Sequence, residues 1–132
     1  MPSGTSFPPA VSAMREEALR LFDAGVIAAD PEEAVLKALP ERRPDLIVAL
    51  GKAAPGMIRA ALARFGLVPA IVITHRENGE ADLPPGVQVF FAGHPVPDEV
   101  GLAGAKAVLE AVSRLAFGQR LLVLISGGGS AL

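Results

Sequence analysis

Three short segments of this chain hold the side chains best suited to chemistry, and each directly follows an apolar run. Lys52 stands in a Gly-Lys turn, where its ammonium group would attract an anion. His94 lies between a glycine and a proline, and its imidazole ring could hydrogen-bond a substrate hydroxyl or act as a general base. The third segment, SGGGS at 126–130, has glycines whose N–H groups can turn toward an anion without side-chain obstruction. Together these segments indicate an anion site.

Each segment also has a plainer interpretation. A loop lysine can simply be solvated, a histidine can pack to orient a turn, and a glycine-rich segment can be a flexible turn. A strand that runs directly into three glycines favours a phosphate or carboxylate site over a flexible turn. The residues that we assign to the site are Gly51, Lys52, His94, Ser126, Gly127, Gly128, Gly129 and Ser130.

Neither common nucleotide-binding signature fits these segments. A Walker P-loop requires a glycine five residues before its Gly-Lys pair and a serine or threonine after it, but these positions hold Leu46 and Ala53. The dinucleotide fingerprint requires a final glycine where Leu132 stands. The sequence therefore predicts an anion site of neither type.

Four apolar runs predict the strands that position these segments. The runs are continuous rather than alternating, which is typical of strands covered on both faces in a parallel sheet. Because ligands bind outside the carboxyl ends of such strands, the three segments would meet at one edge. The direction of the third strand stays open, since the loop before it is near the minimum length for a parallel return. The predicted strands are 46–50, 70–74, 87–91 and 121–125.

Apolar residues at helical spacing predict four helices, placed on both faces of the sheet. The first begins at Ala10 after a flexible lead-in, residues 1–9, and carries an apolar stripe that includes Met14 and Phe22. The next two are 31–39 and 55–65. The last starts after Asp98 and Glu99, interpreted as helix-start carboxylates rather than magnesium ligands, and continues to about residue 115. Its predicted buried face is Val100, Gly104, Ala107, Val108, Ala111 and Leu115.

Composition excludes several classes of protein. A chain of 132 residues fits one domain, and no run approaches the roughly 18 apolar residues of a membrane span. The absence of cysteine excludes disulfides and thiolate metal sites, and suits a cytoplasmic protein. A net charge of -2, with no tyrosine, tryptophan or basic cluster, argues against a nucleic-acid partner. No metal-ligand cluster stands out, and His75 is interpreted as a surface residue.

Four blocks of sequence, in this order, resemble the N-terminal part of the type 2 glycerate kinases, the glycerate 2-kinase family whose C-terminal domain is called MOFRL. Older labels for such sequences read hydroxypyruvate reductase. The resemblance covers nearly the whole chain and implies a Rossmann-like domain that faces a smaller one across a cleft. The blocks are ALRLFDAGVIAADPEEAVLKAL, VALGKAAPGM, AGHPVPDEVGLAGAKAVLE and LLVLISGGGSAL.

The resemblance implies a kinase that uses ATP and Mg²⁺ to phosphorylate the 2-hydroxyl of D-glycerate. Lys52 matches the lysine of the family's GKA motif, which implies a catalytic role at the developing charge of glycerate or of the transferred phosphoryl group. Residues 126–130 match its glycine-rich loop, and His94 would orient the substrate. Two alternatives stay open: an NAD(P)H-dependent hydroxypyruvate reductase, and an inactive remnant that binds anions.

The family's chains are much longer, so residues 1–132 correspond to an incomplete N-terminal domain, without the C-terminal part and the MOFRL domain. The predicted sheet is truncated after its fourth strand. We expect this chain alone not to phosphorylate glycerate at a measurable rate. The surface that would face the missing part should be apolar and exposed, which favours self-association.

Overall fold

The computed structural model describes residues 8–79 and 82–132. Most of the predicted flexible lead-in therefore lies outside the described residues, and its last residue, Pro9, already belongs to a helix. The chain divides into two compact units, with the boundary between Asp30 and Pro31.

The first unit contains one helix, α1, from Pro9 to Ala28. A proline suits the first helical position because its missing N–H group would have no partner there. None of the residues of α1 is buried, and the side chains of its predicted stripe are largely exposed, with Met14 at 73% and Phe22 at 67%. The stripe therefore forms as predicted, but nothing in its own unit covers it.

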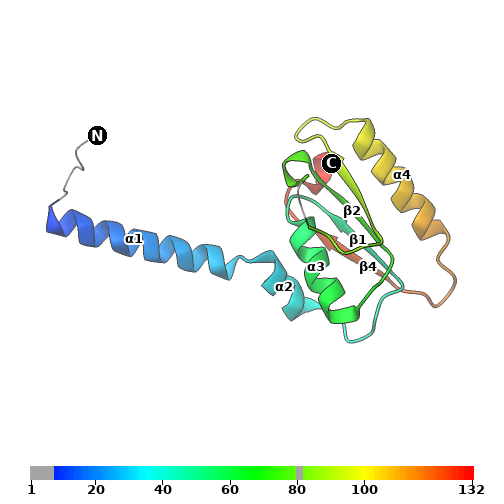
Figure 1. Ribbon diagram of the computed structural model, residues 1–132, viewed down its shortest axis with the longest axis horizontal. Coiled ribbons are helices and arrows are strands. Elements are labelled where there is room, and N and C mark those ends of the chain that lie inside the picture. Colours follow the sequence, from blue (N-terminus) through cyan, green and yellow to red (C-terminus); the bar gives the residue numbers. More distant parts are fainter. Residues whose placement is uncertain (1–7, 80–81) are drawn as a thin grey trace. The chain divides into compact units, whose positions relative to one another are not determined.

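The second unit is built on a sheet of four strands, which Figure 1 shows with their labels. Their order is β3-β2-β1-β4, and every neighbouring pair is parallel. The third strand, whose direction the sequence left open, is thus parallel like the others. The predicted α/β fold with a parallel sheet is confirmed. The strands are β1 (Leu46–Leu50), β2 (Ala70–His75), β3 (Val87–Ala92) and β4 (Leu121–Ile125).

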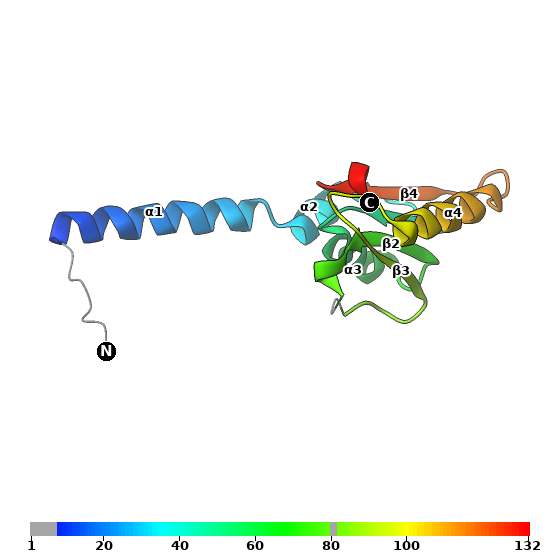
Figure 2. The same ribbon diagram turned by 90° about the horizontal axis from the view of Figure 1, so that it is seen from above.

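Helices cover both faces of this sheet, as predicted. In Figures 1 and 2, α2 (Pro31–Ala38) and α3 (Ala54–Phe65) lie on one face and α4 (Glu99–Ser113) lies on the other. The helix α3 ends where the sequence predicts, because Gly66 adopts a positive φ of 75° that closes its last turn. Two short 3₁₀ turns, η1 (Arg76–Asn78) and η2 (Gly129–Ala131), follow β2 and β4.

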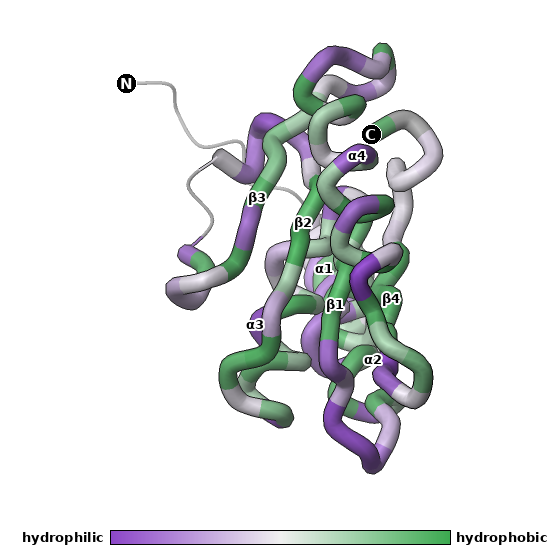
Figure 3. The backbone as a smooth tube through the Cα atoms, turned by 90° about the vertical axis from the view of Figure 1, so that its right-hand side faces the viewer, coloured by the Kyte–Doolittle hydropathy of each residue, from purple (hydrophilic) through white to green (hydrophobic). Residues whose placement is uncertain are grey.

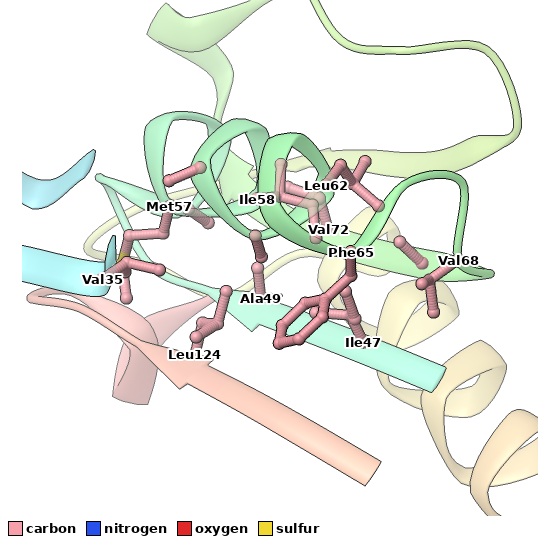
Figure 4. Close-up of a cluster of buried hydrophobic side chains, with 14 residues drawn as sticks. Val35, Ile47, Ala49, Met57, Ile58, Leu62, Phe65, Val68, Val72 and Leu124 are labelled. Atoms are coloured by element: carbon pink, nitrogen blue, oxygen red, sulfur yellow. The ribbon is translucent and has the colours of Figure 1, made fainter. Parts of the chain in front are cut away.

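The core lies between α3 and the sheet, as the sticks in Figure 4 show. Its largest fully buried members are Ile47 and Val72 from the strands and Ile58 from the helix, each at 0% exposure. Figure 3 colours β1 and β2 as hydrophobic along most of their length, which agrees with central strands that have neighbours on both sides. Burial of these side chains stabilises the unit by about 1.5–3 kcal/mol each.

The helix α4 packs closely on the opposite face through glycines. A Cβ atom added at Gly104 would lie 2.8 Å from Ile73 Cδ1, so only a glycine permits this approach. Gly101 is also buried, whereas Val100, which we predicted on the buried face, is 37% exposed. The prediction for Val100 was wrong by one position, because the contact face follows the two glycines.

The edge strand β4 departs from the prediction that all four runs are covered on both faces. Leu121, Val123 and Ile125 are 38%, 44% and 67% exposed, whereas Leu124 is buried. The cause is the strand order, because β4 lies at the edge and α4 packs on β3 and β2. An exposed apolar face is therefore present, and self-association through it stays a prediction. Within residues 8–79 and 82–132, no helix has the length and apolar character needed to cross a membrane.

Candidate anion site

The carboxyl ends of the four parallel strands bring the predicted segments to one edge of the sheet. The Gly51-Lys52 turn follows β1, the His94 turn follows β3, and the glycine-rich segment follows β4. Since β1 lies between β2 and β4, its turn has neighbours on both sides. Lys52 therefore sits at the middle of this edge.

The Gly51-Lys52 turn requires its glycine. Gly51 has a φ of +111°, which side chains of L-residues rarely adopt, and a Cβ atom there would lie 2.6 Å from the Ser126 carbonyl oxygen. The Gly51 N–H group donates to the Ile73 carbonyl (3.0 Å), and the Lys52 N–H group donates to the Gly127 carbonyl (2.9 Å). The backbone of the turn is thus tied to β2 on one side and to the loop after β4 on the other.

The hydroxyl of Ser126 forms hydrogen bonds with the backbone of this turn. Its hydroxyl oxygen accepts from the Ala53 N–H group (3.0 Å), and the same hydroxyl donates to the Leu50 carbonyl (3.3 Å). The Ser126 N–H group also donates to Leu50 (2.9 Å). We predicted this hydroxyl as an anion donor, but in the structure it is engaged in joining β4 to the turn after β1.

Gly128 brings the lysine and the histidine together. It has a φ of +85°, and a Cβ atom placed on it would lie 3.2 Å from both His94 Nε2 and Lys52 Cγ. Both side chains therefore rest against the backbone of Gly128, although the three residues come from three different loops. Lys52 is exposed, and among the described residues no acidic side chain lies within ion-pair distance of it.

The glycine-rich segment offers unused donors beside these two side chains. Among the described residues, the N–H groups of Gly127 and Gly128 donate to no backbone carbonyl, whereas the N–H group of Gly129 makes a long 3.4 Å contact with Ser126 O. Gly129 itself packs near Leu50, and Ser130 is exposed in η2. The structure thus brings Gly128 to the side chains of Lys52 and His94 and Gly127 to the backbone of Lys52. Among the described residues, the Ser130 hydroxyl forms no hydrogen bond with either side chain.

Asp98 holds the His94 turn. Its Oδ2 accepts from the Gly93 N–H group (3.0 Å) and pairs with Arg76, while its Oδ1 accepts from the Gly101 N–H group (2.9 Å) at the start of α4. The hydrogen bond from Gly101 is the largest cause that holds the pKa of the Asp98 carboxyl below its ordinary 3.8. The bonds from Gly93 and Arg76 lower this pKa further, while partial burial opposes them. The helix-start role predicted for Asp98 is confirmed.

We predicted His75 as a surface residue, but in the structure it does not lie free on the surface. Its side chain is only 18% exposed, and its Nδ1 atom lies 3.4 Å from Glu77 Oε2. Its ring stands edge-on to that of His94, with centroids 5.6 Å apart and an interplanar angle of 85°. The end of β2 therefore contributes to the same edge as the other three strands, because parallel strands end together.

Two further residues, one at the end of β2 and one in η1, hold the site, and we did not predict either of them from the sequence. Thr74 is fully buried and its hydroxyl donates to the Gly51 carbonyl (2.9 Å), while the Asn78 side-chain amide donates to the Lys52 carbonyl (2.8 Å). Both residues lie at or just after the end of an apolar run. We had applied the rule that such ends form the site to the other three strands only. The sequence shows that Thr74 ends such a run, but not that Asn78 returns to β1.

The groups gathered here favour an anionic ligand. They are a lysine ammonium group, an imidazole ring and two backbone N–H groups, all of which bind phosphate or carboxylate oxygens. In the part of the chain that the structure describes, no group of three or more histidine, aspartate or glutamate side chains could hold a metal ion.

The structure defines an α/β protein with a parallel sheet and a candidate anion site at the carboxyl edge of its strands. A family model described as a domain of unknown function, DUF4147, matches residues 17–132. The chain therefore belongs to the DUF4147 family.

Relatives of known name agree with the resemblance read from the sequence. Glycerate 2-kinase from Pyrococcus horikoshii is 37% identical over 90% of this chain, and D-glycerate 2-kinase from Thermotoga maritima is 34% identical over 90%. A relative from Agrobacterium vitis with a hydroxypyruvate reductase name is 39% identical over 89%. The chain spans only 30%, 29% and 27% of these relatives, respectively.

Solved structures extend the agreement to the fold. The crystal structure of glycerate kinase from Thermotoga maritima superposes on 92% of this chain with a TM-score of 0.80 and 33% identity, and the chain covers 30% of it. The resemblance to the glycerate 2-kinase family and the predicted fold are both confirmed.

Proposed function

We propose that this chain forms the N-terminal part of a kinase that transfers a phosphoryl group from ATP to the 2-hydroxyl of D-glycerate. One observation carries the proposal: Lys52 and His94 rest against Gly128 at the carboxyl edge of the sheet, beside N–H groups that have no backbone acceptor within residues 8–79 and 82–132. The names of the relatives support the substrate and the reaction. The missing length would belong to the C-terminal part and the MOFRL domain, and the kinase would act in the cytoplasm.

Each residue of the site has a different proposed role in the reaction, which follows from its chemical groups. In the reaction, the 2-hydroxyl oxygen of glycerate bonds to the γ-phosphorus, the bond between this phosphorus and the bridging oxygen of ADP breaks, and the hydroxyl proton is released. Lys52 would stabilise the negative charge of the glycerate carboxylate or of the transferred phosphoryl group. The N–H groups of Gly127 and Gly128 would hold an anionic oxygen, and His94 would orient the substrate hydroxyl. Mg²⁺ would neutralise phosphate charge.

Hydroxypyruvate reduction is the second candidate, because relatives from Agrobacterium vitis carry that name. The site offers it little support. A dinucleotide fingerprint has a glycine at its last position, where this chain has Leu132.

A hybrid enzyme would test the kinase proposal. Residues 31–132 would replace the matching segment of the Thermotoga maritima kinase, and ADP release would be followed with ATP, Mg²⁺ and D-glycerate. We expect turnover, and we expect Lys52→Ala to lower kcat by about a hundredfold, the effect of removing one charge-stabilising group. Lys106→Ala removes an exposed lysine from α4 and is the matched control.

Two outcomes would contradict the proposal. Equal kcat values for Lys52→Ala and Lys106→Ala would return Lys52 to the class of solvated loop lysines. NADH oxidation in the presence of hydroxypyruvate, without ADP release in the presence of glycerate, would favour the reductase instead.

A further inference from the structure

The geometry points to Asn78 as a positioning residue for Lys52, acting through the lysine's backbone carbonyl. The inference rests on the proposed role of Lys52 in binding an anion. It concerns a residue that does not itself touch the ligand, but that fixes the direction in which the lysine side chain leaves the turn.

The contacts of Asn78 all lead to the turn after β1. Its Nδ2 atom has two hydrogens, and it donates to the Lys52 carbonyl and to Thr74 Oγ1, both at 2.8 Å. Thr74 Oγ1 in turn donates to the Gly51 carbonyl at 2.9 Å. The Asn78 amide and the Thr74 hydroxyl therefore hold two successive carbonyl groups of the turn from the β2 side.

The opposite side of the turn is held by the loop after β4. The Lys52 N–H group donates to the Gly127 carbonyl, and the next N–H group, that of Ala53, donates to the Ser126 hydroxyl. The N–H and C=O groups of Lys52 are thus bonded to two different loops, one on each flank. With both groups fixed, the Cα–Cβ bond of Lys52 has one direction, and only its side-chain torsions remain free.

Local structure does not explain the contact between Asn78 and Lys52. Asparagine in a turn commonly bonds to its own neighbouring backbone. Here the turn η1 is closed by backbone groups alone, with the Gly79 N–H donating to the Arg76 carbonyl at 2.9 Å, while the Asn78 amide reaches across to residue 52. Truncation of Asn78 would therefore leave η1 closed and would free the carbonyl of Lys52.

Loss of this contact should weaken anion binding more than folding. Asn78 is half-buried and lies outside the core cluster, so its removal creates no large cavity. On its β2 flank, the turn would keep the hydrogen bonds that Gly51 forms with Thr74 and Ile73, but the Lys52 carbonyl would lose its partner there. The ammonium group would then sample a wider region around the anion. Positioned groups lose effect when their support is removed.

The experiment is a double-mutant cycle on the 132-residue chain, with inorganic phosphate as the probe and NMR shifts of the Gly127 and Gly128 amides as the readout. We expect Lys52→Ala to weaken phosphate binding about fivefold, as for one partly solvated charge contact. Asn78→Ala should weaken it about threefold, the scale of one hydrogen bond. In the Lys52→Ala background, Asn78→Ala should cause no further loss, because its effect passes through the lysine. Gln88→Ala, which truncates an exposed amide on β3, is the matched control.

The possible outcomes separate this inference from the proposed function. Full additivity of the two losses would assign Asn78 a merely structural role and overturn the inference alone. The inference alone is also overturned if Lys52→Ala weakens phosphate binding but Asn78→Ala binds phosphate as tightly as Gln88→Ala does. If phosphate does not shift the Gly127 and Gly128 amides, or if Lys52→Ala binds like the wild type, the proposed anion site fails and the inference fails with it.

Discussion

The two turns that present basic side chains at the sheet edge are held in different ways. The Lys52 turn is held by hydrogen bonds with uncharged groups of β2, of η1 and of the loop after β4. The His94 turn depends on one carboxylate, Asp98, which bonds to Gly93 and also starts α4. The first turn therefore belongs to the sheet, whereas the second is tied to a helix through a charge.

This difference assigns different sensitivities to the two turns. Uncharged hydrogen bonds do not titrate over the usual pH range, so the position of Lys52 should change little with pH. The His94 turn should loosen when the Asp98 carboxylate is protonated, because its hydrogen bonds are made to the ionised form. Substitutions in the two turns can test this contrast.

Gly51→Ala should have the largest effect, since it breaks the sheet-bound turn. The new Cβ atom would lie 2.6 Å from Ser126 O and 2.9 Å from Ser126 C, at a φ that favours glycine. We expect the free energy of unfolding, measured by urea denaturation, to fall by about 3 kcal/mol or more. Gly118→Ala separates the two causes, because Gly118 has a φ of +90° but nothing within 4 Å. Equal losses in both variants would show that the close contact with Ser126 contributes nothing.

Ser126→Ala should have a smaller effect on the same turn. It leaves the Ala53 N–H group without its acceptor and removes one of two donors to the Leu50 carbonyl. We expect a loss of about 1–2 kcal/mol in the free energy of unfolding. Ser113→Ala, at the exposed end of α4, is the control and should lose much less. A neutral result for Ser126→Ala would mean that the Ser126 hydroxyl is available to a ligand after all.

Asp98→Asn should have an effect that depends on pH. The pKa of Asp98 is lower in the folded chain than its ordinary 3.8, so its ionised form stabilises the fold. This contribution is complete above the ordinary pKa and is lost as pH falls through the lower, folded value. We therefore expect the variant to be less stable than the wild type near pH 7 and the difference to shrink as the pH falls below the ordinary pKa of 3.8. Urea denaturation at several pH values measures it, with Glu99→Gln as the control. A stability difference that is constant with pH would show that the charge of the Asp98 carboxylate does not cause it.

Lys52→Ala should have the smallest effect on stability, despite its large expected effect on turnover. The lysine side chain is exposed and its backbone groups, not its ammonium group, hold the turn. We expect a change within about 0.5 kcal/mol in the free energy of unfolding, typical of surface substitutions. A loss as large as that of Ser126→Ala would show that the side chain is part of the fold.

Much of the fold could be predicted because its signals are local. Continuous apolar runs bounded by glycine and polar residues locate all four strands to within a residue or two. The exposure of β4 could not be predicted, because its sequence, LLVLI, is as apolar as that of the central strand β1. The difference between them comes from the order of strands in the sheet, which no single run encodes.

The site was predictable to the extent that it depends on strand ends. The same rule that brought Lys52, His94 and the glycine-rich segment together also applies to β2, and its omission explains why His75 was read as a surface residue. The role of Asn78 was not predictable in this way. Its partner is 26 residues away along the chain, and an Asn-Gly pair in a polar loop is typical of an ordinary turn.

Gly104, which lies away from the sheet edge, affects the position of the candidate site through the packing of α4. Besides Ile73, an added methyl group would meet Phe90 Cγ at 3.1 Å, and a ring within a strand cannot move aside as easily as the end of an isoleucine. The helix would then shift outward as a rigid rod, and it would displace Asp98 and the backbone of Gly93 with it. An apolar contact in the middle of α4 thus acts as a spacer that sets where the imidazole of His94 stands. With the role that we propose for His94, a larger side chain at position 104 would alter substrate orientation without any change at Lys52 or His94 themselves.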